Sequence, residues 1–225
     1  MMHLQINKKI FIYIFFFVLF GSLNNKFLLE FRLNEIKEID ILGLGEIEKN
    51  KLLKSLSSLD LKNIFYLKET EIRERIDANN IVENYTIKKR YPFSLEIQIN
   101  QTKFLANFYN ENEIFFVGSN GKLIKTNNRK EELPTIFGQY DAKSFFHLFN
   151  VIEDSNFDLK RIKNLYFFKS GRWDIETNAG MLIKLPGQNL QEKLNLSSKI
   201  LNSNNFDEIK ILDLRQKNQV IINGK

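Results

Sequence analysis

The sequence begins with one long apolar run, and after it polar and apolar positions alternate on a much shorter scale. Residues 10–20, IFIYIFFFVLF, carry no charge, and Lys8 and Lys9 stand immediately before them. A helix rises about 1.5 Å per residue, so the run extended to Leu23 spans roughly 21 Å, less than the roughly 30 Å hydrocarbon core of a bilayer. Continued through residue 29, the helix reaches bilayer length. The pattern therefore predicts a membrane anchor over residues 10–29.

Two other interpretations of this run stay open. Its length also suits the apolar part of a cleaved signal peptide, although residues 20–24 offer no Ala-x-Ala-like cleavage site. A helix buried in the folded part is the third interpretation. Lys8 and Lys9 favour an amino terminus on the cytoplasmic side, because basic loops tend to stay inside. We therefore expect a cytoplasmic tail and anchor over residues 1–33, with the bulk of the chain on the far side of the membrane.

Residues 34–101 show the pattern β-α-α-β-β. Ile39 and Ile41 alternate with charged neighbours, as in a half-buried strand, and helical spacing follows in two segments, the second over residues 69–77. Two further strands are expected around the turn at Tyr91-Pro92. The apolar positions of these helices and strands are Leu52, Leu53, Leu56 and Leu59, then Ile72 and Ile76, then Tyr85 and Ile87, and finally Leu95, Ile97 and Ile99. Two helices on a three-stranded sheet would bury them in one small core.

Residues 102–225 change to short strands separated by turn signals such as Gly118-Ser119-Asn120-Gly121. Leu133-Pro134 and Gly138 indicate a loop. Amphipathic helices are expected over residues 142–152 and 190–201. The expected strands cover residues 162–168, 173–177, 181–185, 209–212 and 220–222. The chain is therefore predicted to be α+β: a transmembrane helix, a β-α-α-β-β domain over 34–101, and a mostly antiparallel β domain with flanking helices over 102–225.

The composition excludes several classes of site. None of the 225 residues is cysteine, so disulfides, thiolate nucleophiles and Cys-ligated metals are impossible. The formal net charge is +6, but 33 basic residues are mixed with 27 acidic ones, and the densest basic cluster is Lys88-Lys89-Arg90. Such mixing is typical of a solvated surface rather than of a nucleic-acid-binding face. We expect no nucleic-acid partner.

Few residues could perform chemistry. The histidines stand apart, His3 in the amino-terminal tail and His147 inside a Phe-rich helix, without a second ligand at metal-binding spacing. No Gly-x-Ser-x-Gly, phosphate-binding glycine loop or His-Glu-x-x-His occurs. Glu131-Glu132 and Glu153-Asp154 are adjacent in sequence, which does not make their carboxylates face each other. We therefore predict no catalytic site, metal, cofactor or small-molecule substrate, and the sequence favours binding over turnover.

Several short motifs occur in a characteristic order. Those of residues 34–101 are Ile39-Asp40-Ile41-Leu42-Gly43, Asn63-Ile64-Phe65, and Arg90-Tyr91-Pro92 followed by Leu95-x-Ile97-x-Ile99; those of residues 102–225 are Leu133-Pro134-x-x-x-Gly138, Arg172-Trp173-Asp174-Ile175, the segment Asn178 to Leu185, and Asp213-Leu214-Arg215. In order and spacing behind one apolar segment, they resemble the FtsQ/DivIB family of cell-division proteins. Residues 34–101 are similar to its POTRA domain and residues 102–225 to its β domain. The chain departs from the family pattern at Asn100-Gln101 and at Val117-Gly118-Ser119.

The resemblance implies a single-pass inner-membrane protein of the divisome, located at the division septum. It implies that FtsB/FtsL-type partners bind the last strand of the β domain and connect the protein to septal peptidoglycan synthesis. The corresponding positions here are Arg215, Gln219, Val220, Ile221, Ile222 and Asn223. A strand at the edge of a sheet leaves backbone N–H and C=O groups unpaired, which an incoming segment can satisfy by β-augmentation. Arg215 would then pair with an acidic side chain of the partner.

Each of these implications has an alternative. Residues 220–222 could only complete the core sheet, with Arg215 bonded inside the chain. Arg90-Tyr91-Pro92 could form a turn and nothing more, or could dock another septal protein. The whole chain could instead be a POTRA-containing component of protein export or outer-membrane assembly. A periplasmic hydrolase is opposed by the lack of a nucleophile and base pair.

Overall fold

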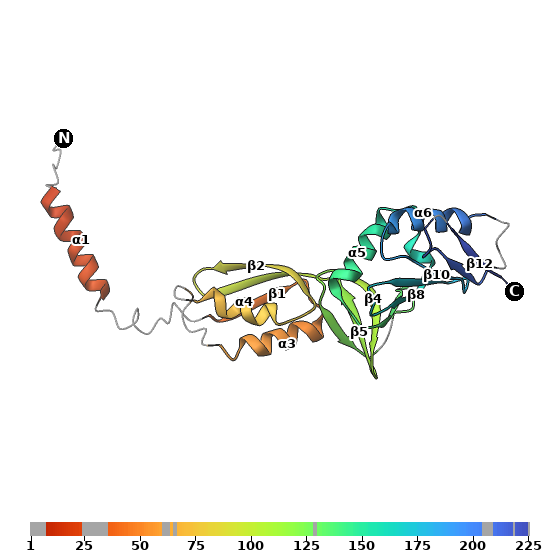
Figure 1. The fold of residues 1–225 in the computed structure, drawn as a ribbon. Coiled ribbons are helices and arrows are strands. Elements are labelled where there is room, and N and C mark those ends of the chain that lie inside the picture. The colour runs from red at the N-terminus through yellow and green to blue at the C-terminus, as the bar shows by residue number, and fades with distance from the viewer. Residues whose placement is uncertain are drawn as a thin grey trace. The chain divides into compact units, whose positions relative to one another are not determined.

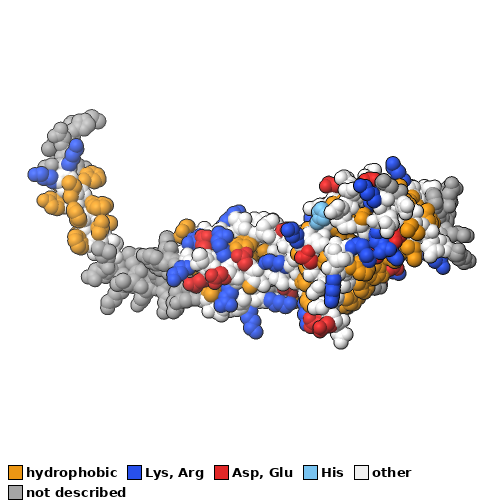
Figure 2. Space-filling view, viewed as in Figure 1, with side chains coloured by type: hydrophobic (Ala, Val, Ile, Leu, Met, Phe, Trp, Pro, Cys, Tyr) orange, Lys and Arg blue, Asp and Glu red, His pale blue; other side chains and the backbone are white. Residues whose placement is uncertain are grey.

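The computed structural model describes residues 8–23, 36–59, 64, 67–127, 130–203, 209–217 and 219–224. Its first element is helix α1 (Lys8–Leu23), whose side chains give it an almost continuous apolar surface beyond the two lysines (Figure 2). In this described part of the chain, no helix combines the length and the apolar character that crossing a bilayer requires. The predicted span continues over residues 24–29, which lie outside the described residues.

The chain forms two compact units that alternate along the sequence. The first contains residues 1–75 and 86–98, and the second contains residues 76–85 and 99–225. Strands β2 (Val82–Arg90) and β3 (Ser94–Gln101) therefore contribute residues to both units. The sequence-based domain boundary at Gln101 stays a prediction.

The smaller sheet has the strand order β1-β3-β2, and β1 (Glu38–Leu42) runs parallel to β3. Helices α3 (Glu46–Leu56) and α4 (Glu69–Asp77) lie between β1 and β2 in the chain (Figure 1), which is the predicted β-α-α-β-β order. Most of the predicted apolar positions are buried, each at most 2% exposed: Leu52, Leu56, Ile72, Ile76, Leu95, Ile97 and Ile99. The others, Leu53, Leu59, Tyr85 and Ile87, are only half-buried. Ile64 is also buried, while its motif neighbours Asn63 and Phe65 lie outside the described residues.

The second unit contains a nine-stranded sheet with the order β12-β11-β10-β9-β8-β7-β4-β5-β6. The strands are β4 (Phe104–Asn110), β5 (Glu113–Gly118), β6 (Leu123–Thr126), β7 (Thr135–Gly138), β8 (Ile162–Phe167), β9 (Trp173–Thr177), β10 (Leu182–Lys184), β11 (Ile211–Asp213) and β12 (Ile221–Asn223). Antiparallel neighbours predominate, as predicted. The parallel neighbours are β4 with β7, β7 with β8, and β10 with β11.

Two helices make the crossovers that parallel strands require. Helix α5 (Ala142–Glu153) connects β7 to β8, and α6 (Leu190–Leu201) connects β10 to β11; Figure 1 shows both on one face of the sheet. The Asp141 carboxylate caps α5 by accepting a 2.9 Å hydrogen bond from the Ser144 N–H. The buried face of α5 consists of Phe145, Leu148 and Ile152, each 1% exposed.

One row of apolar side chains crosses this sheet from strand to strand. In register, it consists of Phe108, Ile136, Leu165, Ile175, Ile183, Leu212 and Ile222. The first six are at most 4% exposed and belong to the same hydrophobic cluster as the buried residues of α5 and α6. Ile222, the last, is 42% exposed. We call these residues the core row. It begins in the interior at Phe108 and ends at Ile222, which is partly exposed to solvent.

Strand β7 corrects one expectation. We predicted a loop from Leu133-Pro134 to Gly138, but residues 135–138 form a strand in the middle of the sheet, between β4 and β8. Four residues are too few for a period-two signal, and the flanking proline and glycine indicated a loop. The approach to β7 is held by Asn107, whose side-chain amide donates to the Lys130 and Leu133 carbonyls at 2.7 and 3.0 Å.

Residues 76–85 join the second unit through the turn between β5 and β6. The side-chain amide of Asn120 donates to the carbonyls of Asn80 and Val82 at 3.0 and 2.9 Å. In return, the Asn80 amide donates to the Leu123 carbonyl at 2.8 Å. The predicted turn at residues 118–121 therefore also holds the beginning of β2.

Gly138 generates the first testable prediction. Its φ is +101°, and a Cβ there would lie 2.2 Å from the backbone carbonyl oxygen of Phe167 in the neighbouring strand. We expect Gly138→Ala to lower the free energy of unfolding by about 2 kcal/mol or more, since neither backbone segment can yield easily. Thermal unfolding of the full chain in mild detergent, followed by circular dichroism, measures the loss.

Gly187→Ala is the matched control, because no atom lies within 4 Å of its added Cβ and its φ is not positive. Equal melting temperatures for the two variants would contradict the crowding at Gly138.

Candidate partner-binding edge

Strand β12 occupies one end of the nine-stranded order and pairs with β11 alone. The pairing is antiparallel and matches Ile211 with Asn223, Leu212 with Ile222, and Asp213 with Ile221. No other described strand lies beside β12. A strand paired on one side directs about half of its backbone N–H and C=O groups away from the sheet. Sequence analysis predicted an edge strand within residues 219–223, and the structure has one over residues 221–223.

The apolar side chains of this edge are unusually accessible. Val220, Ile221 and Ile222 are 40%, 50% and 42% exposed, and Gln219 and Asn223 are also exposed. Ile222 lies in register with the buried Leu212 and so continues the core row, whereas Ile221 belongs to the opposite face. An added strand could therefore extend the core row on one face and cover Ile221 on the other.

Arg215 is bonded within the chain rather than extended from it. Its Nε lies 2.8 and 3.0 Å from the two carboxylate oxygens of Asp213, and its Nη2 lies 2.5 Å from Oδ2. These donors lower the pKa of Asp213, and the carboxylate in turn raises the pKa of Arg215. The Arg215 side chain remains 41% exposed. The internal bond that sequence analysis offered as an alternative therefore exists, and pairing of Arg215 with a partner stays a prediction.

Asp213 belongs to a row of charges on the face opposite the core row. In register across β9, β10 and β11 stand Asp174, Lys184 and Asp213. Burial raises the pKa of Asp174, while Arg172, Lys184 and Arg215 oppose that rise; Arg172 Nε lies 3.2 Å from its Oδ1. Side chains of alternating charge thus lie on neighbouring strands from β9 to β11, the strand that pairs with β12.

Sequence analysis named the motifs that contain both aspartates but did not connect them. It did not single out Lys184, the residue between them. The alternation of apolar and charged residues along each strand could have connected these three residues, because each charged residue stands next to a core-row residue in its own strand.

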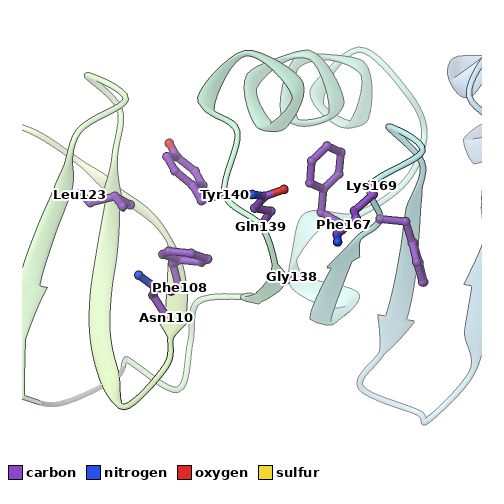
Figure 3. Close-up of a pocket in the computed structure, with 9 residues that line it drawn as sticks. Phe108, Asn110, Leu123, Gly138, Gln139, Tyr140, Phe167 and Lys169 are labelled. Carbon is purple, nitrogen blue, oxygen red and sulfur yellow. The ribbon is translucent and has the colours of Figure 1, made fainter.

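The described part of the second unit contains several cavities. One, of about 380 Å³, opens beside Arg215 between residues 214–217 and the first turn of α6. Another, of about 410 Å³, is lined by Glu131 and Glu132 together with lysines of the same unit. A third, of about 790 Å³, opens at the carboxyl ends of β4, β7 and β8 (Figure 3). Its walls carry the rings of Phe108, Tyr140 and Phe167, so it can hold an apolar group.

Other residues considered for chemistry are dispersed. His147 is exposed on α5, and His3 lies outside the described residues. Within the described ranges, no group of three or more His, Asp or Glu side chains could hold a metal ion. The open edge at β12 is therefore the candidate site for partner binding.

Comparison with protein families matches both halves of the chain. Residues 107–215 match the model "Cell division protein FtsQ/DivIB, C-terminal", and residues 34–100 match "POTRA domain, FtsQ-type". The cell division protein FtsQ of Rickettsia bellii is 25% identical over 195 residues, which cover 84% of this chain and 72% of that relative. The DivIB protein of Clostridium botulinum is 32% identical over 98 residues, covering 43% of this chain and 37% of that protein.

Among solved structures, the extracytoplasmic domain of DivIB from Geobacillus stearothermophilus is similar to part of the chain. The overlay covers 46% of this chain and 98% of that domain, at 14% identity and a TM-score of 0.34. That score is too low to bear on the fold.

The ion pair between Asp213 and Arg215 generates a pH-dependent prediction. A carboxylate whose pKa is lowered by folding stabilises the protein above its unfolded pKa of about 3.9, and that stabilisation disappears as the pH falls through the folded value. We expect Asp213→Asn to lower the free energy of unfolding by about 1 kcal/mol at neutral pH, because the pair is partly exposed. The difference from the unaltered protein should vanish near pH 2.

Thermal unfolding at neutral and acid pH measures this difference. Glu132→Gln removes an exposed carboxylate elsewhere in the same unit and should leave the free energy of unfolding unchanged at both pH values. A deficit of Asp213→Asn that persisted at acid pH would show that the side chain acts through packing and not through its charge.

Proposed function

Because this chain belongs to the FtsQ/DivIB family of cell-division proteins, we propose that it is a division scaffold that binds FtsB/FtsL-type partners by β-augmentation at β12. In this role the protein performs no catalysis. It holds its partners near the enzymes of septal peptidoglycan synthesis. The FtsQ-type POTRA match favours this role over the export or outer-membrane assembly role.

The observation that carries the proposal is the position of β12 at the end of the nine-stranded order. Each backbone hydrogen bond to an added strand contributes about 1 kcal/mol net, so a short strand supplies only moderate affinity by itself. Side chains must supply the remainder. Ile222 offers an unfinished core row, and covering its exposed surface contributes about 1 kcal/mol more.

The opposite face of β12 sets the polar requirement on the partner. Asp213 lies in register with Ile221, and Arg215 holds Asp213 with part of the arginine side chain exposed. An acidic partner side chain beside this pair would share the guanidinium, which can bind two carboxylates at once through its several donors. The preferred segment therefore alternates an apolar side chain next to Ile222 with an acidic one near Arg215.

Membrane attachment is the second part of the proposal. Residues 10–29 would anchor the protein in the inner membrane with Lys8 and Lys9 in the cytoplasm, and the two compact units in the periplasm. The apolar surface of α1 supports this attachment, since eleven consecutive uncharged residues of this helix are exposed.

Substitution of Ile221 tests the edge. We expect Ile221→Pro and Ile221→Asp to reduce capture of an FtsB/FtsL-type partner from detergent-solubilised membranes by at least about tenfold, because proline removes a backbone donor and aspartate places a charge opposite Asp213. The melting temperature should change little, because the buried part of the core row ends at β11.

Ile47→Asp is the control, since Ile47 is 73% exposed and lies on α3. Undiminished capture by folded Ile221→Pro protein would remove the edge-strand proposal, whatever the result with aspartate.

Localisation in dividing cells tests the cellular role. We expect a fluorescent fusion of the full chain to concentrate at division septa, and the same fusion carrying Ile221→Pro to concentrate less. An even distribution of the unaltered fusion around the cell envelope would argue against a role in division.

A further inference from the structure

One end of the first unit carries a cluster of basic and aromatic side chains. Strand β2 turns into β3 at residues 91–93, and the cluster consists of Lys37, Lys88, Lys89, Arg90, Tyr91 and Phe93. We call it the basic tip. We propose that the basic tip binds the headgroups of anionic phospholipids in the membrane that holds the anchor. This inference rests on the membrane attachment in the proposed function.

The topology of the sheet places the basic tip where the chain enters the first unit. Because β1 is parallel to β3, the beginning of β1 lies next to the β2–β3 turn (Figure 1): Glu38 is in register with Ser94, and the Lys37 N–H donates to the Phe93 carbonyl at 2.9 Å. Along the sequence, residues 24–36 connect Lys37 to α1.

The tether to α1 is short. Twelve residues, 24–35, separate Leu23 from Ile36, and even a fully extended segment of that length reaches at most about 45 Å. Gln98, which is in register with Leu42 at the end of β1, lies roughly 13 Å farther along β3 than Ser94. Of the two ends of this sheet, the basic tip is therefore the one nearer to the anchor along the chain.

The side chains of the basic tip suit an anionic interface. Lys88 and Arg90 lie on the same face of β2 and are 56% and 62% exposed, although both point toward the buried carboxylate of Glu96. That carboxylate is paired with Arg90 and lies 3.9 Å from Lys88, so it orients the two cations and compensates only part of their charge. Strand β1 contributes two further carboxylates, Glu38 and Asp40, the second in register with Glu96, so three carboxylates stand against four cations and the basic tip keeps a net positive charge.

The aromatic residues supply the remaining requirement. Tyr91 is 60% exposed at the apex of the turn, and the Lys37 ammonium lies 4.9 Å from the centre of the Phe93 ring. Tyrosine is enriched at membrane interfaces, where its ring contacts the apolar boundary and its hydroxyl stays hydrated. Lysine side chains extend along such a boundary and place their ammonium groups among phosphates. The combination of exposed cations and an exposed tyrosine is therefore better suited to contact with a phospholipid surface than to full exposure to water.

Site-specific labelling tests the contact, and the absence of cysteine makes every introduced thiol unique. The full chain carrying Tyr91→Cys is labelled with an environment-sensitive fluorophore and reconstituted into nanodiscs that contain nitroxide-headgroup lipid. Gln98→Cys is the comparison farther along β3, beside the end of β1, and Phe17→Cys on α1 reports insertion of the anchor. The nanodiscs contain phosphatidylcholine alone or a mixture with phosphatidylglycerol.

We expect quenching at residue 91 to exceed that at residue 98, and to do so only with phosphatidylglycerol present. Raising the salt from about 0.1 M to about 1 M should abolish the excess, because the screening length falls from about 10 Å to about 3 Å. Adding Lys88→Gln and Lys89→Gln should weaken the contact about fivefold or more. The pair Lys49→Gln and Lys54→Gln on α3, which removes the same charge from the same unit, should leave it unchanged.

The outcomes separate this inference from the proposed function. A hydrocarbon environment at residue 17 without selective quenching at residue 91 would reject lipid binding by the tip and leave the anchor intact. A hydrated label at residue 17 would reject the anchor and this inference together. Equal quenching in neutral and anionic nanodiscs would exclude headgroup charge as the cause. A signal at residue 91 that appeared only after addition of an FtsB/FtsL-type partner would assign the tip to protein docking instead.

Discussion

The second unit depends on the register that aligns the core row across its sheet. From Phe108 to Leu212, six apolar side chains on six neighbouring strands meet on one face, where α5 and α6 cover them. A shift of one residue in any strand would turn its member of the row to the other face and replace it with a polar neighbour such as Asp174, Lys184 or Asp213. The strands at the β12 end are only three residues long, so this burial, more than strand length, holds them in place.

The same register accounts for the open edge. The core row reaches β12 through Ile222 but is not covered there, and on the other face the row of charges reaches Asp213 and Arg215 one strand earlier. The edge therefore presents an unfinished apolar row and a partly exposed cation on opposite faces. Backbone pairing by itself accepts almost any extended segment, whereas this combination restricts both the alternation and the charge of the segment that fits.

Much of this architecture was predictable from the sequence because strong periodicity coincided with burial. The helix over residues 69–77 and the strand marked by Leu95, Ile97 and Ile99 occur as predicted. Strand β7 was missed, because its four residues lie between a proline and a glycine, and only tertiary pairing with β4 and β8 makes them a strand. The contribution of Asn80 and Val82 to the second unit was equally unpredictable, since it depends on hydrogen bonds from Asn120, about forty positions later. For the candidate site, the sequence with its family resemblance indicated the residues of β12, but the attachment of Arg215 to Asp213 required coordinates.

Amide hydrogen exchange of the full chain, with and without an FtsB/FtsL-type segment, tests the central claim most directly. If the segment adds as a strand beside β12, amides within residues 219–223 become protected, while β6 at the opposite end of the sheet exchanges as before. Unchanged exchange throughout β12 in a saturated complex, with protection appearing on β6 or on the helices, would contradict the account.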